Sequence, residues 1–424
     1  MKTTWDRYRS FDTTVQLLLV NQLTINLGFY MLMPYLAAHL SEGLAMATWA
    51  VGLILGVRNL SQQGMFLVGG ALADRFGYKP LIVAGCALRT VGFAALAFAD
   101  SLPALIAASA ATGLAGALFN PAVRAYLATE SGDRRVEAFA LFNVFYQTGI
   151  LLGPLVGLAL TAVSFPITCL AAAALFSILT VLQIRKLPEN RGTPREERPA
   201  LREQAGTVLR NRPFWLFAGA MTGSYVLSFQ IYLALPLETE RLVGDGTLAT
   251  VATSALFVVS GLVALVGQMR ITDWCKQNWS PTRCLVTGMA IMGGAFLPPM
   301  LTASFESLPA GLGAVMAVVP LLVCAGVLAV ATAVLYPFEM DTIVGLSHGR
   351  WVATHYGLYN TVCGIGITLG NLATGALLDA ARDVGYGALP WAVLALIGLA
   401  CAAALAAIGR TGRLPTTEQV PVRA

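Results

Sequence analysis

The feature that most limits the fold of this chain is a series of long apolar blocks separated by short polar segments. The blocks lie near residues 14–37, 48–72, 80–99, 102–126, 138–161, 165–184, 214–236, 247–269, 283–303, 309–335, 354–378 and 387–409. A helix needs about 20 apolar residues to cross the hydrocarbon core of a bilayer. Charged residues make up only 12% of the chain, roughly half the share of an ordinary soluble protein. The sequence therefore predicts an all-α membrane protein with 12 transmembrane helices.

The blocks form two groups of six around a polar segment. We expect a six-helix bundle at 1–184, a cytoplasmic linker at 185–213, a second bundle at 214–409 and a cytoplasmic tail at 410–424. The linker carries eight basic and four acidic residues with Pro and Gly, which is typical of a solvated connector. A shift of 217 residues places Leu141–Gly153 on Leu358–Gly370 with Leu, Asn, Ile and both Gly positions matching. Such parallel repeats predict two pseudo-symmetric bundles and a transport site near the bilayer midplane.

The distribution of Lys and Arg predicts the orientation of the chain in the membrane. Twenty-three of these residues fall on the side of the termini and the linker, and two, Arg241 and Arg382, fall in the opposite loops. Lys and Arg are enriched in cytoplasmic loops, so we expect both termini and the linker to be cytoplasmic. The first apolar run is too long for the core of a signal peptide, so we expect it to be retained as a membrane span.

The loop between the second and third blocks reads GGALADRFGYKP and matches the pattern G-x-x-x-D-R/K-x-G-x-R/K. The matching residues are Gly70, Asp74, Arg75, Gly77 and Lys79. This pattern resembles the cytoplasmic loop signature of the major facilitator superfamily. Gly70 would let two helices approach closely, Gly77 would turn the chain, and the Asp74 carboxylate could accept from the N-terminus of the eleventh helix. We expect these residues, with Arg124, to form a conformational gate.

The fifth block contains GILLGPLVGL, with Gly149, Gly153, Pro154 and Gly157. This run resembles the antiporter motif of the same superfamily, although Leu158 stands where that motif usually ends in Gly. A Gly-Pro element bends a helix and allows close packing, and generic small-residue packing is the alternative interpretation. Together the two motifs resemble the twelve-helix drug:proton antiporters. The resemblance implies the major facilitator fold and a monomeric multi-pass protein of a bacterial inner membrane, working by alternating access on a small molecule and protons.

Two positions depart from the exporter pattern. Ser109 stands in the fourth block where family exporters usually carry Arg, and the first block has Asn21, Gln22 and Asn26 in place of an acidic residue. The usual proton site is therefore not visible in the sequence. Glu339, at the cytoplasmic end of the tenth block, is the first candidate for carrying the proton, and Asp341 is the second. A solvated helix-end charge is the alternative for both.

Polar and aromatic side chains inside the blocks are the candidates for substrate binding. At about 100° per residue they form helix faces in the blocks that line the cavity in this superfamily. The candidates are Asn26, Arg58, Gln62, Asn120, Asn143, Tyr146, Gln147, Tyr225, Phe229, Tyr232 and Asn360. Such stripes are also common in helix cores, so each member has an ordinary packing alternative.

Arg58 and Arg89 lie deep in their blocks, where an Arg costs about 2.5–3.5 kcal/mol on insertion scales. No acidic residue lies at the same depth in the first six blocks. We predict that Arg58 binds an anionic group of the substrate, and satisfaction by backbone carbonyls and nearby amides is the alternative. Third spans are peripheral in this fold, so Arg89 is interpreted as structural.

Several functions remain open at this point. The leading interpretation is export of small amphipathic molecules, drugs or metabolites, by proton antiport. The alternatives are a dedicated exporter of a siderophore or another organic anion, and a nutrient:proton symporter. We expect no enzyme activity, no cofactor and no metal, because the chain has no HExxH, no CxxC among its seven Cys and no P-loop. The basic residues form no aromatic-interleaved patch, so nucleic acid is not an expected partner.

Overall fold

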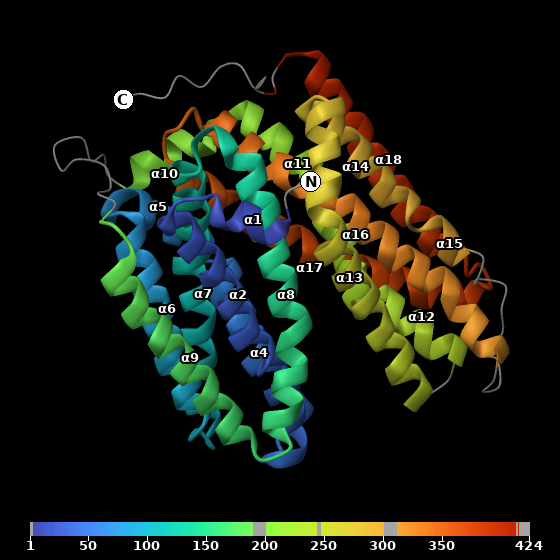
Figure 1. Ribbon diagram of the computed structural model, residues 1–424. Coiled ribbons are helices and arrows are strands. Elements are labelled where there is room, and N and C mark those ends of the chain that lie inside the picture. The colour runs from blue at the N-terminus through green and yellow to red at the C-terminus, as the bar shows by residue number, and fades with distance from the viewer. Residues whose placement is uncertain (1–2, 190–200, 244–246, 301–311, 413, 415–424) are drawn as a thin grey trace. The chain divides into compact units, whose positions relative to one another are not determined.

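The computed structural model describes residues 3–189, 201–243, 247–300, 312–412 and 414 (Figure 1). Every regular element within these ranges is a helix, and none is a strand. The middle of the predicted linker, residues 190–200, lies outside the described residues, as do the ends of two predicted spans at 301–311 and the tail from 415. The chain starts with a short helix, α1 (Thr4–Arg9), before the first span.

Nine helical segments of the described chain are long and apolar enough to cross a membrane. They are formed by α6 (Tyr78–Leu96), α7 (Leu102–Glu130), α8 (Arg135–Thr161), α9 (Phe165–Lys186), α11 (Arg212–Ser228) continuing into α12 (Ala234–Val243), α13 (Thr247–Asn278), α16 (Leu312–Ser347), α17 (Val352–Val384) and α18 (Leu389–Arg410). Each corresponds to one predicted apolar block. A short 3₁₀ turn, η4 (Phe229–Tyr232), separates α11 from α12.

The three remaining blocks are each divided into two helices. The pairs are α2 (Thr13–Tyr30) with α3 (Met33–Ala38), α4 (Thr48–Gln63) with α5 (Phe66–Phe76), and α14 (Pro281–Gly294) with α15 (Leu297–Met300). Breaks shorten α4 and α14, and the polar residues Asn21, Gln22 and Asn26 lower the mean hydropathy of α2, so these blocks do not count among the nine long apolar segments of the described chain. The expected all-α membrane fold is confirmed.

The chain forms two compact units. The first comprises Met1–Asn211 with Ser347–Thr361, and the second comprises Arg212–Leu346 with Val362–Ala424. In the first unit α6 packs on α7 and α9, α2 on α8, and α4 on α7 (Figure 1). In the second unit α18 packs on α14 and α11, and the core includes the buried rings of Phe296 and Trp391. The predicted limits of the two bundles stay a prediction, but α17 has residues in both units.

The linker contains one further helix, α10 (Leu201–Leu209), which packs on α5. Its side chains Gln204 and Val208 are buried, with 1% and 0% of their surface exposed. Two side chains of this segment are therefore buried, and the interpretation of the linker as a cytoplasmic connector stays a prediction. An apolar and an amide side chain at i and i+4 give α10 one face that can pack against the first unit.

Candidate functional site

The turn between α5 and α6 has the geometry that its sequence predicts. Gly77 is the only residue between the two helices, and its φ of 98° lies in the region that favours glycine. The chain therefore reverses within one residue after α5. This turn fixes the position of Asp74 in the last turn of α5.

The Asp74 carboxylate accepts hydrogen bonds from the first turn of α17. The donors are the backbone N–H of Ala353 at 3.1 Å, the backbone N–H of Thr354 at 2.7 Å and the Thr354 hydroxyl at 2.6 Å. The first amides of a helix have no partner within that helix, and the positive end of its dipole favours an anion. The predicted contact between Asp74 and the N-terminus of the eleventh span is confirmed.

Two glycines bring the backbones of α5 and α17 into direct contact. A Cβ atom added to Gly70 would overlap the carbonyl oxygen of Ala353, and a Cβ added to Gly357 would overlap the carbonyl oxygen of Phe66. Each helix therefore contributes one glycine to the crossing. We call Gly70, Asp74, Ala353, Thr354 and Gly357 the α5–α17 junction. Its predicted members are Gly70 and Asp74, and sequence reasoning missed Gly357.

The linker helix also reaches the α5–α17 junction. The Gln204 amide donates to the Thr354 hydroxyl at 2.8 Å, and the Asn211 amide lies 3.3 Å from the His355 ring nitrogen. Thr354 thus donates to Asp74 and accepts from Gln204. Gln204 was not predicted as a contact residue, because it lies in a polar segment rich in charged residues.

Burial and hydrogen bonding act on the Asp74 carboxylate in opposite directions. Asp74 lies beyond the predicted span 48–72 and only 6% of its surface is exposed. Burial raises the pKa of Asp74 to about 6, although the hydrogen bonds from Thr354, Ala353 and Tyr78 lower it. The carboxylate is therefore mainly ionised at pH 7, which its role as acceptor requires.

The other predicted gate residues have separate contacts. The half-buried Arg75 guanidinium lies 5.8 Å from the centroid of the Phe76 ring, and Lys79 is also half-buried. Arg124 donates to the Asn360 side-chain oxygen at 2.8 Å. This bond joins a predicted gate residue on α7 to a predicted substrate residue on α17. Asn360 is 8% exposed, so its availability to a substrate stays a prediction.

The glycines of the fifth span face α2. A Cβ on Gly149 would lie 2.6 Å from Asn26 Cβ, one on Gly153 would lie 2.6 Å from Tyr30 Cβ, and one on Gly157 would overlap the Met31 carbonyl oxygen. The Tyr35 hydroxyl donates to the carbonyl of Pro154 at 2.7 Å. The expected close packing is confirmed, and the expected bend stays a prediction.

The remaining substrate candidates of the first unit differ in burial. Asn26 is buried, and its amide donates to the Gln22 carbonyl at 2.7 Å within the same helix. Asn143 is 4% exposed. Four others are half-buried, namely Gln62, Asn120, Tyr146 and Gln147. The half-buried side chains are the more accessible of the set, and binding by any of them stays a prediction.

Arg58 and Arg89 meet at the ring of Phe29. The guanidinium carbons lie 5.0 Å and 5.3 Å from its centroid, respectively. Arg89 is 4% exposed and also lies against the rings of Phe119 and Phe176, at 6.0 Å and 5.4 Å. Helix packing therefore brings Arg89 beside the Arg58 candidate, and the interpretation of Arg89 as structural stays a prediction.

The candidates of the second unit lie on α11, η4 and α16. The α-helix ends at Ser228, so Phe229 and Tyr232 belong to the 3₁₀ turn, where their ring centroids are 5.5 Å apart. Tyr225 and Phe229 are half-buried and Tyr232 is 45% exposed. Glu339 is 2% exposed and Asp341 is half-buried, both near the end of α16.

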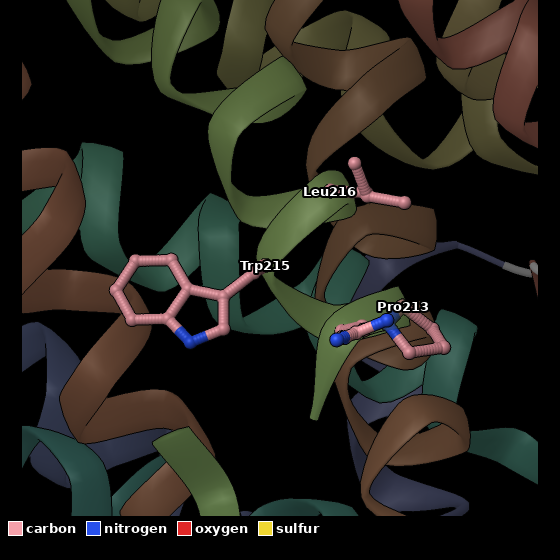
Figure 2. A pocket seen from close by; sticks show the side chains of 4 residues that line it. Pro213, Trp215 and Leu216 are labelled. Carbon is pink, nitrogen blue, oxygen red and sulfur yellow. The ribbon is translucent and has the colours of Figure 1, made fainter. Parts of the chain in front are cut away.

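A hollow at the start of α11 is a separate feature. It is lined by Arg212, Pro213, Trp215 and Leu216, and Figure 2 shows Trp215 and Leu216 on different sides of the helix. None of the predicted site residues lines it, so we do not assign it to substrate. Within the part of the chain that the structure describes, no group of three His, Cys, Asp or Glu residues could hold a metal ion.

Comparison with known proteins agrees with this architecture. The family model of the Major Facilitator Superfamily matches residues 18–371. The chain is 53% identical over 94% of both chains to the uncharacterized MFS-type transporter Rv0849 of Mycobacterium tuberculosis. It is 30% identical over 90% of both chains to the multidrug resistance protein MdtH of Klebsiella pneumoniae.

A solved structure supports the same fold. The human organic anion transporter MFSD10 superposes with a TM-score of 0.71 at 16% identity, covering 92% of this chain and 98% of the other. The runs GVRNLSQQG, GGALADRFGYKP and ALFNPAVRA resemble MdtH, in agreement with the sequence match. The matched family model covers most of the chain and includes both helices of the α5–α17 junction. This multi-pass membrane protein belongs to the major facilitator superfamily of transporters.

Proposed function

We propose that this transporter exports small amphipathic molecules from bacteria by alternating access, in exchange for protons. Similarity to a multidrug resistance protein and the Gly-Pro motif at Gly153 and Pro154 support export. The excess of Lys and Arg on one side supports an inner-membrane orientation with cytoplasmic termini. We infer a monomer, because each predicted bundle supplies its own half of the transport unit.

The observation that carries this proposal is the α5–α17 junction. Residues of α17 up to Thr361 belong to the first unit, and those from Val362 belong to the second. A contact that binds or releases the first turn of α17 therefore acts on a helix with residues in both units. Three hydrogen bonds to Asp74 supply a contact of moderate strength, since bonds to charged groups are worth about 1.5–3 kcal/mol each. Alternating access needs such a contact, strong enough to bias one state and weak enough to break.

We propose that Glu339 carries the proton that is exchanged for substrate. A carboxylate that is 2% exposed in an otherwise apolar membrane helix is expensive to retain without a function. Asp341, two residues further along, is less buried. We therefore expect Glu339 to bind and release a proton during the transport cycle, with Asp341 as the second candidate.

Transport in proteoliposomes with an imposed pH gradient tests this assignment. The probe is the fluorescent cation ethidium, and the protein is the full chain. Wild-type protein should move ethidium against its concentration gradient when the pH gradient is applied. Glu339→Gln should abolish this uphill movement and retain downhill exchange, because the amide cannot carry a proton.

The matched control is Asp383→Asn, an exposed carboxylate near the end of α17. It should retain uphill transport. If Glu339→Gln keeps its full dependence on the pH gradient, the proton assignment to Glu339 is wrong. If the wild-type protein moves ethidium only downhill, with or without the pH gradient, the antiport proposal fails for this probe.

A further inference from the structure

Two arginines share one aromatic ring in the interior of the first unit. Arg58 on α4 and Arg89 on α6 have their guanidinium carbons 5.0 Å and 5.3 Å from the centroid of Phe29 on α2. The sum of these distances, about 10 Å, is the greatest separation that the two carbons can have. Two positive charges are therefore held close together by three helices.

The fourth helix at this place is α7. A Cβ atom on Gly116 would lie 3.0 Å from Arg89 Nη2 and 3.0 Å from Gln62 Cδ. The absence of a side chain at Gly116 thus leaves space that the Arg89 guanidinium and the Gln62 amide share. Gln62 is one turn beyond Arg58 on α4, so Arg58, Gln62 and Arg89 converge on one place.

No carboxylate neutralises the two arginines. The segments α2, α4, α6 and α9 contain no Asp or Glu, and α7 contains one only at its last residue, Glu130. Among the described residues, Arg58 donates only to the Asn59 side chain, and the buried Arg89 Nε has no hydrogen-bond partner. Three rings around Arg89 provide cation–π contacts, which favour the cation but leave its charge and its N–H donors in place.

The arginine pair is open on the side of Arg58. Arg58 and Gln62 are half-buried, and Asn59 is exposed. Gly52 and Gly56, on the same side of α4 as Asn59, have no atom within 4 Å of an added Cβ. An amide facing hydrocarbon is unfavourable, so an exposed Asn at this depth is better explained by a water-filled path than by lipid.

We propose that Arg58 and Arg89 together bind the anionic group of a transported molecule, so that the substrates include organic anions with an apolar body. The proposal rests on the proposed transport function. A guanidinium presents a planar fork that matches carboxylate, sulfonate or phosphate oxygens, and Phe29 lies where an apolar group of the same molecule can pack. Arg89 supplies the buried charge, and Arg58 supplies the accessible one.

Binding of two probes that differ in charge tests the site. The probes are naphthalene-2-sulfonate, a permanent anion, and the neutral naphthalene-2-sulfonamide. Affinities are measured by calorimetry with the full chain in phosphatidylcholine nanodiscs. The wild-type protein should bind the sulfonate at least about tenfold more tightly than the sulfonamide, because charge-assisted bonds are worth about that factor or more.

Four variants connect this preference to the arginines. Arg58→Gln and Arg89→Gln should each reduce the sulfonate preference by about tenfold, and the double variant should lose less than the product of the two because one anion contacts both. Arg58→Lys should retain part of the preference, since the charge remains and the fork is lost. The control Arg270→Gln removes an equal charge at an exposed position on α13 and should leave the preference unchanged.

The ratio of the two affinities does not depend on the fraction of protein that folds. If Arg89→Gln does not fold, Arg89→Lys is measured in its place.

Three results would overturn the proposal. The first is an equal affinity for both probes in the wild-type protein, or no saturable binding of the sulfonate. The second is an unchanged preference in Arg58→Gln and Arg89→Gln, which would make both arginines structural. The third concerns lipid. If phosphatidylglycerol in the nanodisc weakens sulfonate binding to the wild-type protein but not to Arg58→Gln, the site binds a lipid headgroup. Uphill movement of ethidium is measured in a separate assay. A failure of the anion-binding proposal therefore does not refute proton antiport, and a failure of proton antiport does not refute anion binding.

Discussion

Replacing Asp74 by Asn should loosen the first turn of α17. Asp74 accepts from the N–H groups of Ala353 and Thr354 and from the Thr354 hydroxyl, at 2.6 to 3.1 Å. An Asn side chain keeps one acceptor oxygen, but it loses the charge and places an NH₂ group against these donors. A bond to a charged group is worth about 1.5–3 kcal/mol and a neutral one about 0.5–1.5 kcal/mol. The expected loss is therefore about 1–1.5 kcal/mol for each bond that the Asn oxygen keeps, which weakens the contact by at least about tenfold in an equilibrium.

Hydrogen–deuterium exchange of the α17 first turn measures this effect directly. The Ala353 and Thr354 amides have no partner within their own helix, so their protection depends on Asp74. We expect exchange at these amides to be at least about tenfold faster in Asp74→Asn and faster again in Asp74→Ala. The control Asp133→Asn changes an exposed carboxylate in the first unit and should leave exchange unchanged. Unaltered exchange at Ala353 and Thr354 in Asp74→Ala would refute the reasoning.

Two further outcomes are expected in the first unit. Gly157→Ala should lower the melting temperature, because its Cβ would overlap the Met31 carbonyl and overpacking costs about 1–3 kcal/mol, whereas Gly52→Ala should not, since the space there is open. Gln204→Ala should speed amide exchange in α10 without abolishing transport, as it removes the bond to Thr354 but leaves Asp74 in place.

The position of Asp74 at a helix end was predictable from local spacing, and the resemblance of its loop to the superfamily signature indicated the eleventh span as its partner. The spacing of Gly70, Asp74 and Gly77 places a carboxylate at a helix end beside a close backbone approach, and a helix N-terminus attracts an anion in any fold. The number and order of the apolar blocks were predictable for a similar reason, since bilayer thickness fixes the length of each span.

The partnership of Arg58 and Arg89 was not predictable from the sequence. A helical wheel gives the face of a residue on its own helix, but the rotation of three helices against one another decides which faces meet. Phe29, Phe119 and Phe176 come from three different helices, and only their packing shows that Arg89 lies beside Phe29. The burial of Gln204 and Val208 on α10 could not be predicted from composition either, because both lie in a segment rich in charged residues.

The most direct test of proton antiport is the direction of proton movement driven by substrate alone. Proteoliposomes with equal pH on both sides and the membrane potential clamped by potassium and valinomycin are loaded with ethidium or naphthalene-2-sulfonate. Efflux of the probe through the wild-type protein should draw protons inward, so the internal pH, followed with pyranine, should fall, and Glu339→Gln should abolish the change. A rise in internal pH would show symport, and an unchanged internal pH during efflux would show uncoupled transport; either result contradicts the account.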